Sequence, residues 1–487
     1  MSLARALAVN TGYQIAGKIV STALGVIIIG LMTRLLGAEG FGAYSTANAF
    51  LQMFALLLDL GLNVTLVAML GEHAGDEAFE RRCLSALFTL RVLSAILILG
   101  LIAPAIAFIF PYPLELKIAI IALTGSFIFP SLNQVVIGAQ QRHLKMFMNA
   151  VSENIGRIIT LGGLLLAPIY GWGLVPLMWL ISLASLASFI VNIWSASRYA
   201  YFGWNWDPAF WKIALKRSWP VGVSIAFGLA YFKADTLILS LVRSQTEVGI
   251  YGAAYRVLEI LITVPFMYAG VLLPILSNAW VKKEFNKFQK FISASVDAML
   301  LIALPMTVGT WLLGVPIMQA VAGPEFADSG SILNILIIAT GIIYLNVAFS
   351  HAVVALDEQR KMLPIYAVVA VATVSLYFWL IPIFGMWAAA WLTVISEIGI
   401  TLGNIYFTHQ RVPIVFKPKT LLASLGACIL MAAMVWVLRT SPLPISILAG
   451  AATYSIALYF LGGIPKELLQ EVLASKRIAT PPPDIHA

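Results

Sequence analysis

The sequence predicts an all-α polytopic membrane protein with about fourteen transmembrane helices. The first reason is composition, since 61% of the 487 residues are hydrophobic and 11% are charged, against about 25% charged residues in ordinary soluble domains. The second is the number of long apolar stretches, and the third is the way lysine and arginine alternate between the loops that join them. So few charges would not cover the surface of a water-soluble globule. The composition therefore excludes a disordered chain, a nucleic-acid-binding tail and an ordinary soluble enzyme.

Fourteen stretches are long enough to cross the roughly 30 Å of hydrocarbon in a bilayer, which takes about 20 mostly apolar residues in a helix. None of them alternates in the manner of a membrane β-barrel strand. The second stretch is long enough to end in a separate short turn after Gly61. In chain order the stretches are 11–33, 44–70, 83–110, 116–139, 149–168, 173–197, 219–242, 248–277, 292–320, 329–356, 363–383, 386–408, 420–439 and 444–462.

The loops orient these spans, because cytoplasmic loops of membrane proteins collect lysine and arginine. With the N-terminus inside, the inside segments hold 21 of the 30 Lys and Arg residues, the outside loops hold 4, and 5 fall within spans. A miscounted span would disturb this alternation from that point onward. We therefore expect a multi-pass protein of the cytoplasmic membrane with both termini in the cytoplasm and no cleavable signal peptide.

The chain is predicted to contain two related halves. The sequence GAYSTA at 42–47 opens the second span, and GIYGAA at 249–254 opens the eighth, 207 residues later. Each follows an acidic residue of an outside loop, Glu39 or Glu247. An offset of six spans gives parallel repeats related by an axis along the membrane normal. The expected parts are an N-terminal six-helix lobe (1–197), a cytoplasmic amphipathic linker (198–218), a C-terminal six-helix lobe (219–408), two additional helices (409–462) and a cytoplasmic tail (463–487).

The linker 198–218 is predicted to form an amphipathic helix in the plane of the lipid headgroups. Asp207 followed by Pro208 suits the N-cap and the first turn of a helix. The segment mixes tryptophans with lysines and an arginine, as helices at the membrane surface do. The alternative is an ordinary linker whose tryptophans anchor the neighbouring spans.

Residues that usually carry catalysis or metal binding form no site in this sequence. Cys83 and Cys428 are isolated, and the five histidines lack the spacing of metal ligands. The stretch GYQIAGK at 12–18 resembles a nucleotide-binding phosphate loop, but it begins a membrane span and lacks the final Ser or Thr. We therefore expect a protein that is not an enzyme and that holds neither a cofactor nor a metal.

Cations inside the spans carry the functional prediction. A charge near the bilayer centre costs at least about 2.5–3.5 kcal/mol, so it should face a partner or a water-filled cavity. Arginine holds phosphate oxygens through two parallel hydrogen bonds, while lysine acts as a point charge. A cavity lined by both suits an anionic headgroup such as a pyrophosphate. For Lys18 and Arg91, reaching back to the inside headgroups is the alternative. The five cations predicted to line a cavity between the halves are Lys18, Arg91, Arg157, Lys233 and Arg256.

Acidic residues inside the spans are candidates either for ion coupling or for structural pairing. A carboxyl group that is buried in a span can exchange a proton near neutral pH, which proton coupling requires. Glu153 with Arg157, and Arg256 with Glu259, have the spacing of ion pairs on one helix face. The four coupling candidates are Asp59, Asp235, Glu259 and Glu397.

Five stretches carry a resemblance to a known family. The chain resembles the lipid-linked oligosaccharide flippases of the polysaccharide biosynthesis transporter family. These are the O-antigen or exopolysaccharide translocases of the multidrug/oligosaccharidyl-lipid/polysaccharide exporter superfamily. The stretches 33–50 and 234–261 are the most specific, because they match in arrangement as well as composition. The resemblance spans nearly the whole chain, and the fourteen spans agree with it. The stretches are TRLLGAEGFGAYSTANAF (33–50), DLGLNVTLVAML (59–70), ADTLILSLVRSQTEVGIYGAAYRVLEIL (234–261), FMYAGVLLPILS (266–277) and GPEFADSGSILNIL (323–336).

The resemblance implies two six-helix lobes around a V-shaped, alternating-access cavity that moves undecaprenyl-diphosphate-linked sugar units to the outer leaflet for polysaccharide biosynthesis and export. Cations of the lumen would hold the diphosphate, and this role is carried to the five cations above by their positions within the spans. The last two helices would accommodate the lipid tail. A proton or sodium ion, or the membrane potential, would drive the cycle. The implied partners are the polyprenyl-diphosphate-linked oligosaccharide, membrane lipid and the polysaccharide polymerase machinery, with no nucleic acid.

Two other functions stay open on sequence grounds. A multidrug or cation antiporter of the same superfamily is one, and the excess of cations within the spans argues against it. A membrane-embedded polysaccharide polymerase or ligase is the other. Such enzymes usually need a sizeable outside loop with catalytic polar groups, whereas the longest outside loop here runs only from about 321 to 331.

Overall fold

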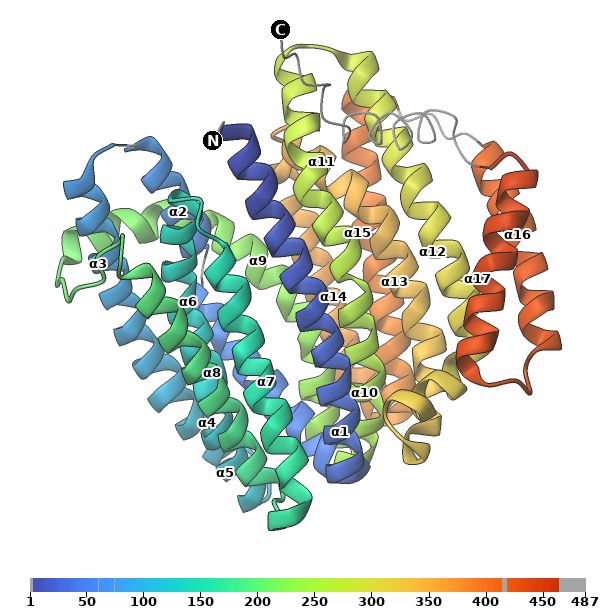
Figure 1. Ribbon diagram of the computed structural model, residues 1–487, viewed down its shortest axis with the longest axis horizontal. Coiled ribbons are helices and arrows are strands. Elements are labelled where there is room, and N and C mark those ends of the chain that lie inside the picture. Colours follow the sequence, from blue (N-terminus) through green and yellow to red (C-terminus); the bar gives the residue numbers. More distant parts are fainter. Residues whose placement is uncertain (1–2, 60, 74, 414–417, 464–487) are drawn as a thin grey trace, which may run out of the picture. The chain divides into compact units, whose positions relative to one another are not determined.

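The computed structural model describes residues 3–59, 61–73, 75–413 and 418–463, with side chains for all of these except 3–11, 13–15, 220–221 and 223–232. The predicted tail 463–487 lies outside the described residues apart from its first position. Every regular element in the described ranges is helical (Figure 1). In chain order the elements are α1 (Leu3–Asp59), α2 (Leu62–Glu72), α3 (Glu77–Ala95), a π-helical segment (Ile96–Ile102), α4 (Ala103–Ile109), α5 (Leu114–Leu123), α6 (Gly125–Arg142), α7 (Phe147–Tyr170), α8 (Leu174–Ala196), α9 (Pro208–Val242), α10 (Gln245–Leu261), α11 (Thr263–Val281), α12 (Phe285–Val321), a 3-10 turn (Pro324–Phe326), α13 (Ala327–Ala355), α14 (Gln359–Phe384), α15 (Met386–Arg411), α16 (Pro418–Val437) and α17 (Leu443–Phe460).

Twelve stretches within the described residues are long and apolar enough to cross a membrane. The first of them, 16–72, covers two predicted spans. The predicted span 219–242 lies within α9 and is not among the twelve, since most side chains in its first half are not described. Each of the other eleven corresponds to one predicted span. The predicted all-helical, polytopic fold is therefore confirmed.

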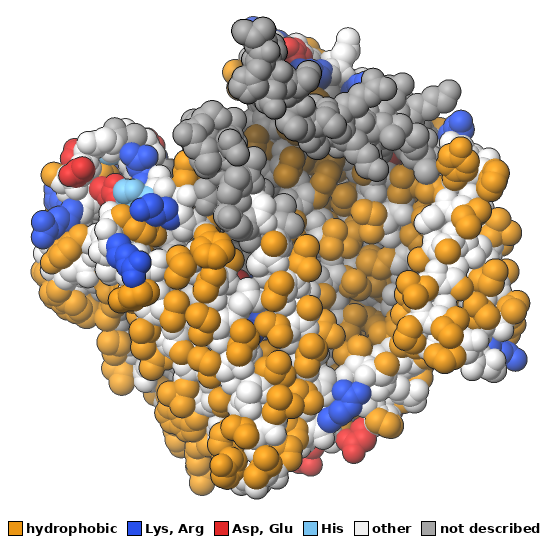
Figure 2. Space-filling view, viewed as in Figure 1, with side chains coloured by type: hydrophobic (Ala, Val, Ile, Leu, Met, Phe, Trp, Pro, Cys, Tyr) orange, Lys and Arg blue, Asp and Glu red, His pale blue; other side chains and the backbone are white. Residues whose placement is uncertain are grey.

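Apolar side chains cover the outer faces of these helices. Figure 2 shows hydrophobic side chains over α7 and α8, while charged side chains gather near α3. On α7, Leu165 is 59% exposed and Ile169 is 75% exposed. Helices keep all their backbone hydrogen bonds internal, so a surface of this kind is stable in lipid. The chain is a multi-pass membrane protein.

Two glycines interrupt the helices of the first two predicted spans. Gly37 has a φ of 65° and kinks α1, and Gly61 has a φ of 73° and separates α1 from α2. Both lie in the left-handed region, which glycine enters without the penalty a Cβ atom brings. The break predicted after Gly61 is confirmed.

The start of α9 confirms the predicted N-cap. The Asp207 carboxylate accepts a hydrogen bond from the Phe210 backbone N–H at 3.0 Å and another from Arg82 Nε at 2.7 Å. Both bonds hold the pKa of the Asp207 carboxyl below its ordinary value, and the bond from the Phe210 N–H contributes more than the bond from Arg82. Phe210 and Ala214 are buried in a core shared with α2 and α3, whereas Trp206 is 64% exposed. One face of this helix therefore packs on protein, and its position in the headgroup plane stays a prediction.

The chain forms two compact units, each of which is described by itself. The first unit comprises 1–256, 318–332 and 363–396, and the second comprises 257–317, 333–362 and 397–487. In the first unit α8 packs against α5, α6 and α7, and α1 packs against α7 and α9 (Figure 1). In the second unit α16 packs against α17. The predicted limits of the two lobes stay a prediction.

The two repeated motifs lie against each other within the first unit. A methyl group on Gly42 would overlap the carbonyl oxygen of Gln245, and one on Gly249 would overlap the carbonyl oxygen of Ala38. Beside this contact, Thr46 Oγ1 donates to Gln245 Oε1 at 2.8 Å. The second part of α1 and the start of α10 therefore cross backbone to backbone, as membrane helices do at small residues.

Each unit also contains an equivalent pair of asparagines. In the first unit Asn192 Nδ2 donates to Asn133 Oδ1 at 2.6 Å, which joins the sixth predicted span to the fourth. In the second unit Asn404 Nδ2 donates to Asn346 Oδ1 at 2.9 Å, which joins the twelfth to the tenth. A bond repeated at an offset of six spans agrees with the predicted internal repeat.

A charged cluster at one end of the second unit should make stability depend on pH. Glu358 lies between α13 and α14, and its side chain is 7% exposed. It pairs with Lys361 Nζ at 2.7 Å and accepts from Arg411 Nε at 2.5 Å. The hydrogen bond from Lys361 is the largest cause of a pKa of Glu358 below its ordinary value, and the bond from Arg411 acts in the same direction.

We expect Glu358→Gln to destabilise the protein at neutral pH by about 1 kcal/mol, because both cationic partners are half exposed. A carboxyl group whose pKa is lowered on folding contributes stability that is fully present above its ordinary pKa of about 4.3. That stability is lost as the pH falls through the lowered value. Thermal unfolding in detergent should therefore show a gap between the melting temperatures of wild type and variant at pH 7 that shrinks as the pH falls below the ordinary pKa of a glutamate, about 4.3. An equal gap above and below that pH would contradict the assignment.

Candidate functional site

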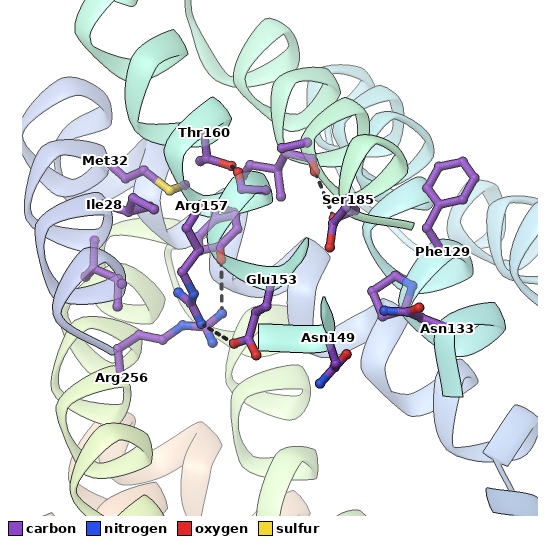
Figure 3. Close-up of a pocket in the computed structure, with 18 of the residues that line it drawn as sticks. Ile28, Met32, Phe129, Asn133, Asn149, Glu153, Arg157, Thr160, Ser185 and Arg256 are labelled. Carbon is purple, nitrogen blue, oxygen red and sulfur yellow. Dashed lines mark hydrogen bonds and ion pairs between the residues drawn. The ribbon is translucent and has the colours of Figure 1, made fainter. Parts of the chain in front are cut away.

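A cavity of about 470 Å³ opens within the first unit (Figure 3). Its walls come from α1, α6, α7, α8 and one residue of α10. The volume is typical of small-molecule sites, which run from about 300 to 1,000 Å³. Apolar side chains of α1 close one wall. The polar residues that line it are Tyr44, Asn133, Gln134, Asn149, Glu153, Arg157, Thr160, Ser185, Ser188 and Arg256.

Helix α7 supplies a polar stripe to this cavity. Asn149, Glu153, Arg157 and Thr160 follow one another at intervals of four, four and three residues, so they share one face of the helix. Gly156 brings α8 close to that face, because a methyl group there would lie 3.1 Å from the Ala184 carbonyl oxygen. The amphipathic pattern of α7 thus places four polar side chains together inside a membrane protein.

Glu153 is the centre of an ion-pair network at the cavity. Its Oε1 lies 3.5 Å from Arg157 Nη2 and 3.6 Å from Lys18 Nζ, and it accepts a hydrogen bond from Ser21 Oγ at 2.6 Å. The predicted pairing of Glu153 with Arg157 is confirmed. Gly25 leaves room for the guanidinium, since a methyl group there would lie 2.7 Å from Arg157 Nη1. In the described part of the chain, the buried Nε of Arg157 has no hydrogen-bond partner.

Arg256 brings a second guanidinium to the same cavity. Its Nη2 donates to the Tyr44 hydroxyl at 3.2 Å, and its guanidinium carbon lies 5.5 Å from the centre of the Tyr44 ring. Figure 3 shows Arg157 and Arg256 converging beside Glu153. Glu153 is the one carboxylate among the described lining residues, and it is already bonded to Lys18 and Arg157. The described lining therefore holds two arginines and one carboxylate, a positive excess among the lining side chains.

The structure places Arg91 elsewhere in the first unit. Its side chain is 2% exposed and pairs with Asp59 Oδ1 at 2.5 Å. Its Nη1 donates to the carbonyl oxygen of Leu58 and to Ser131 Oγ, both at 3.2 Å. Leu58 and Asp59 stand at the C-terminal end of α1, where the helix breaks before Gly61, and Ser131 lies on α6. A cation at a helix C-terminus is favourable for the carbonyl groups that end the helix.

We expect Arg91→Met to lower the thermal stability of the first unit more than Arg157→Met does. The Arg91 change removes two bonds at a helix break and a third to Ser131 on α6. Replacing a buried partner of an ion pair is strongly destabilising. The check is the apparent melting temperature of both variants in detergent, followed by size-exclusion chromatography. Equal stability of the two variants would contradict a capping role for Arg91.

Lys233 and Asp235 lie at buried positions on α9, also away from the cavity lining. Lys233 is 5% exposed, and its Nζ lies 4.5 Å from the centre of the Tyr255 ring. Asp235 is fully buried and accepts hydrogen bonds from the Tyr251 hydroxyl and the Thr236 backbone N–H, both at 2.5 Å. Both residues therefore contact tyrosines of α10.

The remaining two acidic candidates belong to the second unit. Glu259 is half-buried on α10, and Glu397 is 3% exposed on α15. The predicted pairing of Arg256 with Glu259 stays a prediction, as do the roles of all four coupling candidates. The structure thus brings Arg157 and Arg256 to one cavity. Lys18 reaches it only through its ion pair with Glu153, and Arg91 and Lys233 lie at other sites.

Sequence reasoning from charge alone missed the uncharged polar lining. Asn133, Asn149 and Ser185 line the cavity, and Tyr44 positions Arg256. The available signal was periodicity, because polar residues of α7 recur on one face of an otherwise apolar span. Tyr44 already stood in the repeated motif at 42–47.

A family profile decides the relationship of this chain. The profile described as "Polysaccharide biosynthesis protein" matches residues 7–280, more than half of the chain. The chain belongs to the polysaccharide biosynthesis protein family. This is a family of membrane transporters, so the predictions of family membership and of a protein that is not an enzyme are confirmed. A second profile, described as "MatE", matches residues 220–380.

The similarity of this family member to known proteins covers nearly the whole chain. The chain is 24% identical to "Probable flippase AglR" of Haloferax volcanii, with 96% of this chain and 98% of that protein covered. Among solved structures it is similar to a lipid II flippase MurJ in an inward closed conformation, at a TM-score of 0.75 and 17% identity, covering 91% of this chain and 97% of the other. It is also similar to an inward-facing multidrug resistance MATE family transporter, at a TM-score of 0.68 and 15% identity, covering 81% and 94%. These likenesses confirm the predicted fold class.

Proposed function

We propose that this family member is a flippase that moves polyprenyl-diphosphate-linked oligosaccharide units across the cytoplasmic membrane by alternating access, for polysaccharide biosynthesis and export. The barrier to such transport is the cost of moving a charged, hydrated sugar diphosphate through hydrocarbon. A polar cavity replaces water for the headgroup, while the prenyl chain stays in an apolar environment. The relative AglR, by its name a flippase, supports the proposal.

The observation that carries the proposal is the pair of guanidiniums, Arg157 and Arg256, in a cavity inside apolar helices. Guanidinium groups hold phosphate oxygens bidentately. Because Glu153 is bonded to Lys18 and Arg157, a diphosphate entering the cavity would meet Arg256 and the remaining donors of Arg157. The positive excess opposes an organic cation, so this observation favours the flippase over an antiporter for cationic drugs.

An apolar cavity in the second unit suits the lipid part of such a substrate. It has a volume of about 420 Å³ and is lined by α12, α16 and α17. Gly309 of α12 and Gly450 and Ala451 of α17 are among its lining residues, and small residues of this kind leave open space between helices. This supports the expectation that the last two helices accommodate the prenyl tail.

Lys233 belongs to the proposal as a further cation for the diphosphate, and the carboxylates within the spans belong to it as candidates for ion coupling or structural pairing. Asp235 is fully buried and accepts a hydrogen bond from the Tyr251 hydroxyl, so exchange of an ion or proton at Asp235 would alter that contact. Asp59, Glu259 and Glu397 are the other candidates for exchange of a proton or sodium ion. The distribution of Lys and Arg supports both termini lying in the cytoplasm. The polysaccharide polymerase machinery would take up the product.

The test is transport by the purified chain in proteoliposomes. A fluorescent polyprenyl-diphosphate sugar is placed in the inner leaflet, and its arrival in the outer leaflet is followed with a membrane-impermeant quencher. We expect transport well above that of empty liposomes. A cationic dye supplied to the same proteoliposomes provides the contrast, since proton-driven dye transport without sugar-lipid transport would overturn the proposal in favour of the antiporter.

A further inference from the structure

One side of the cavity is uncharged and lies apart from the arginines that are proposed to hold the diphosphate. Every lining residue contributed by α6 and α8 is uncharged, and among them are Asn133 and Ser185. Figure 3 shows Asn133, Phe129 and Ser185 on the side away from Arg256 and Arg157. Asn149 of α7 lies between the two sides in the same view. A headgroup held at the cations would extend toward this uncharged wall.

A ladder of buried amides fixes the orientation of Asn133. Gln140 Nε2 donates to Asn192 Oδ1 at 2.6 Å, and Asn192 Nδ2 donates to Asn133 Oδ1 at 2.6 Å. Gln140 and Asn192 are both fully buried. Because the Asn133 oxygen is taken by Asn192, its Nδ2 donors are left for a ligand, and no described residue accepts from them. Burying amides inside a membrane protein is costly unless they are paired. The two bonds pair both ends of the Asn192 amide, whereas the buried Gln140 Oε1 has no hydrogen-bond partner among the described residues.

The other groups on this wall complement a sugar ring. Ser185 Oγ donates to the Ile181 carbonyl at 3.0 Å, which leaves its lone pairs as acceptors. Sugar hydroxyls both donate and accept, so they match Asn133 as donor and Ser185 as acceptor. Phe129 offers an apolar surface for the C–H face of a sugar, and its ring is held by stacking on Phe189 at 6.1 Å between centroids. With no charge on this wall, an acidic sugar would have no partner.

We infer that the wall of Asn133, Ser185 and Phe129 is a subsite for a neutral hexose or N-acetylhexosamine joined directly to the diphosphate. Asn192 and Gln140 are positioning residues that fix the donors of Asn133. The inference rests on the proposed function, because it needs the diphosphate to be held at Arg157 and Arg256.

The experiment measures binding of three lipids to the full chain in nanodiscs: polyprenyl diphosphate, polyprenyl-diphosphate-N-acetylglucosamine and polyprenyl-diphosphate-glucuronic acid. Two or three new hydrogen bonds and an apolar contact predict about tenfold tighter binding of the N-acetylglucosamine lipid than of the sugar-free lipid. The glucuronic acid lipid should bind no tighter than the sugar-free lipid. Equal binding of all three would overturn the sugar subsite and leave the flippase proposal standing, whereas binding of none would overturn both.

Variants separate a sugar contact from damage to the fold. Asn133→Asp keeps an acceptor for Asn192 but removes both donors. The ratio of the affinity for the N-acetylglucosamine lipid to that for the sugar-free lipid should therefore fall from about ten to close to one. Polyprenyl diphosphate itself should bind no tighter than it does to wild type. Asn192→Leu should reduce the same preference through loss of positioning. Asn404→Leu removes the equivalent amide bond of the second unit and should leave the preference at its wild-type value. An unchanged preference in both first-unit variants would overturn the assignment.

Discussion

Replacing Arg157 and Arg256 together by glutamine should slow flipping of a polyprenyl-diphosphate sugar at least about hundredfold. Hydrogen bonds to charged groups contribute about 1.5–3 kcal/mol each, and a loss of two at the lower end corresponds to a factor of more than 100. Glutamine keeps a polar side chain of moderate length, so the cavity stays polar while its charge falls. The measurement is the initial flipping rate in proteoliposomes at saturating and subsaturating lipid.

A matched control separates this effect from a general loss of positive charge. Arg439 is an exposed cation beside Trp436 and outside the cavity, so Arg439→Gln should flip at the wild-type rate. Lysine at 157 and 256 should give an intermediate rate, since a point charge replaces a bidentate donor. Flipping at the wild-type rate by the double glutamine variant would refute the cationic-cavity mechanism.

Gly42→Ala should cost the protein about 3 kcal/mol or more of stability. The added methyl group would overlap the carbonyl oxygen of Gln245, which is backbone and has no rotamer to move. Overpacking typically costs about 1–3 kcal/mol even where side chains can adjust. Gly249→Ala should behave alike, because its methyl group would overlap the Ala38 carbonyl. The measurement is the apparent melting temperature in detergent, read from the folded fraction after heating.

The control is another helical glycine. Gly162 on α7 has nothing within 4 Å of an added methyl group, so Gly162→Ala should be neutral or stabilise by up to about 1 kcal/mol through helix propensity. The double variant of Gly42 and Gly249 should lose less stability than the sum of the losses in the two single variants. The first added methyl group already forces the two helices apart, so the second meets less overlap. Additive losses would show that the two motifs do not touch.

Much of the fold was predictable because it depends on quantities that run along the chain. The length of an apolar stretch decides whether a helix crosses the bilayer, and the predicted spans correspond to helices. The N-cap at Asp207 and the break after Gly61 were predictable for the same reason. A capping carboxylate and a left-handed glycine act within one turn of their own position.

The site was only partly predictable. Arg91 and Arg157 look alike in sequence, since each is an arginine about two turns into a span from the inside. The fold separates them, because Arg91 meets Asp59 and the end of α1 while Arg157 meets Glu153 beside an open cavity. The amide ladder behind Asn133 carried no sequence signal, since its members are uncharged and lie on two helices.

The sequence by itself determined the class of protein, the helices, the caps and breaks, and the candidate cations, because each depends on residues within a few turns of one another. The tertiary structure alone decided which of those cations share a space and which polar groups complete it. The reason is rotational: hydropathy places a residue at a depth along its helix, and only packing decides which neighbour its side chain faces.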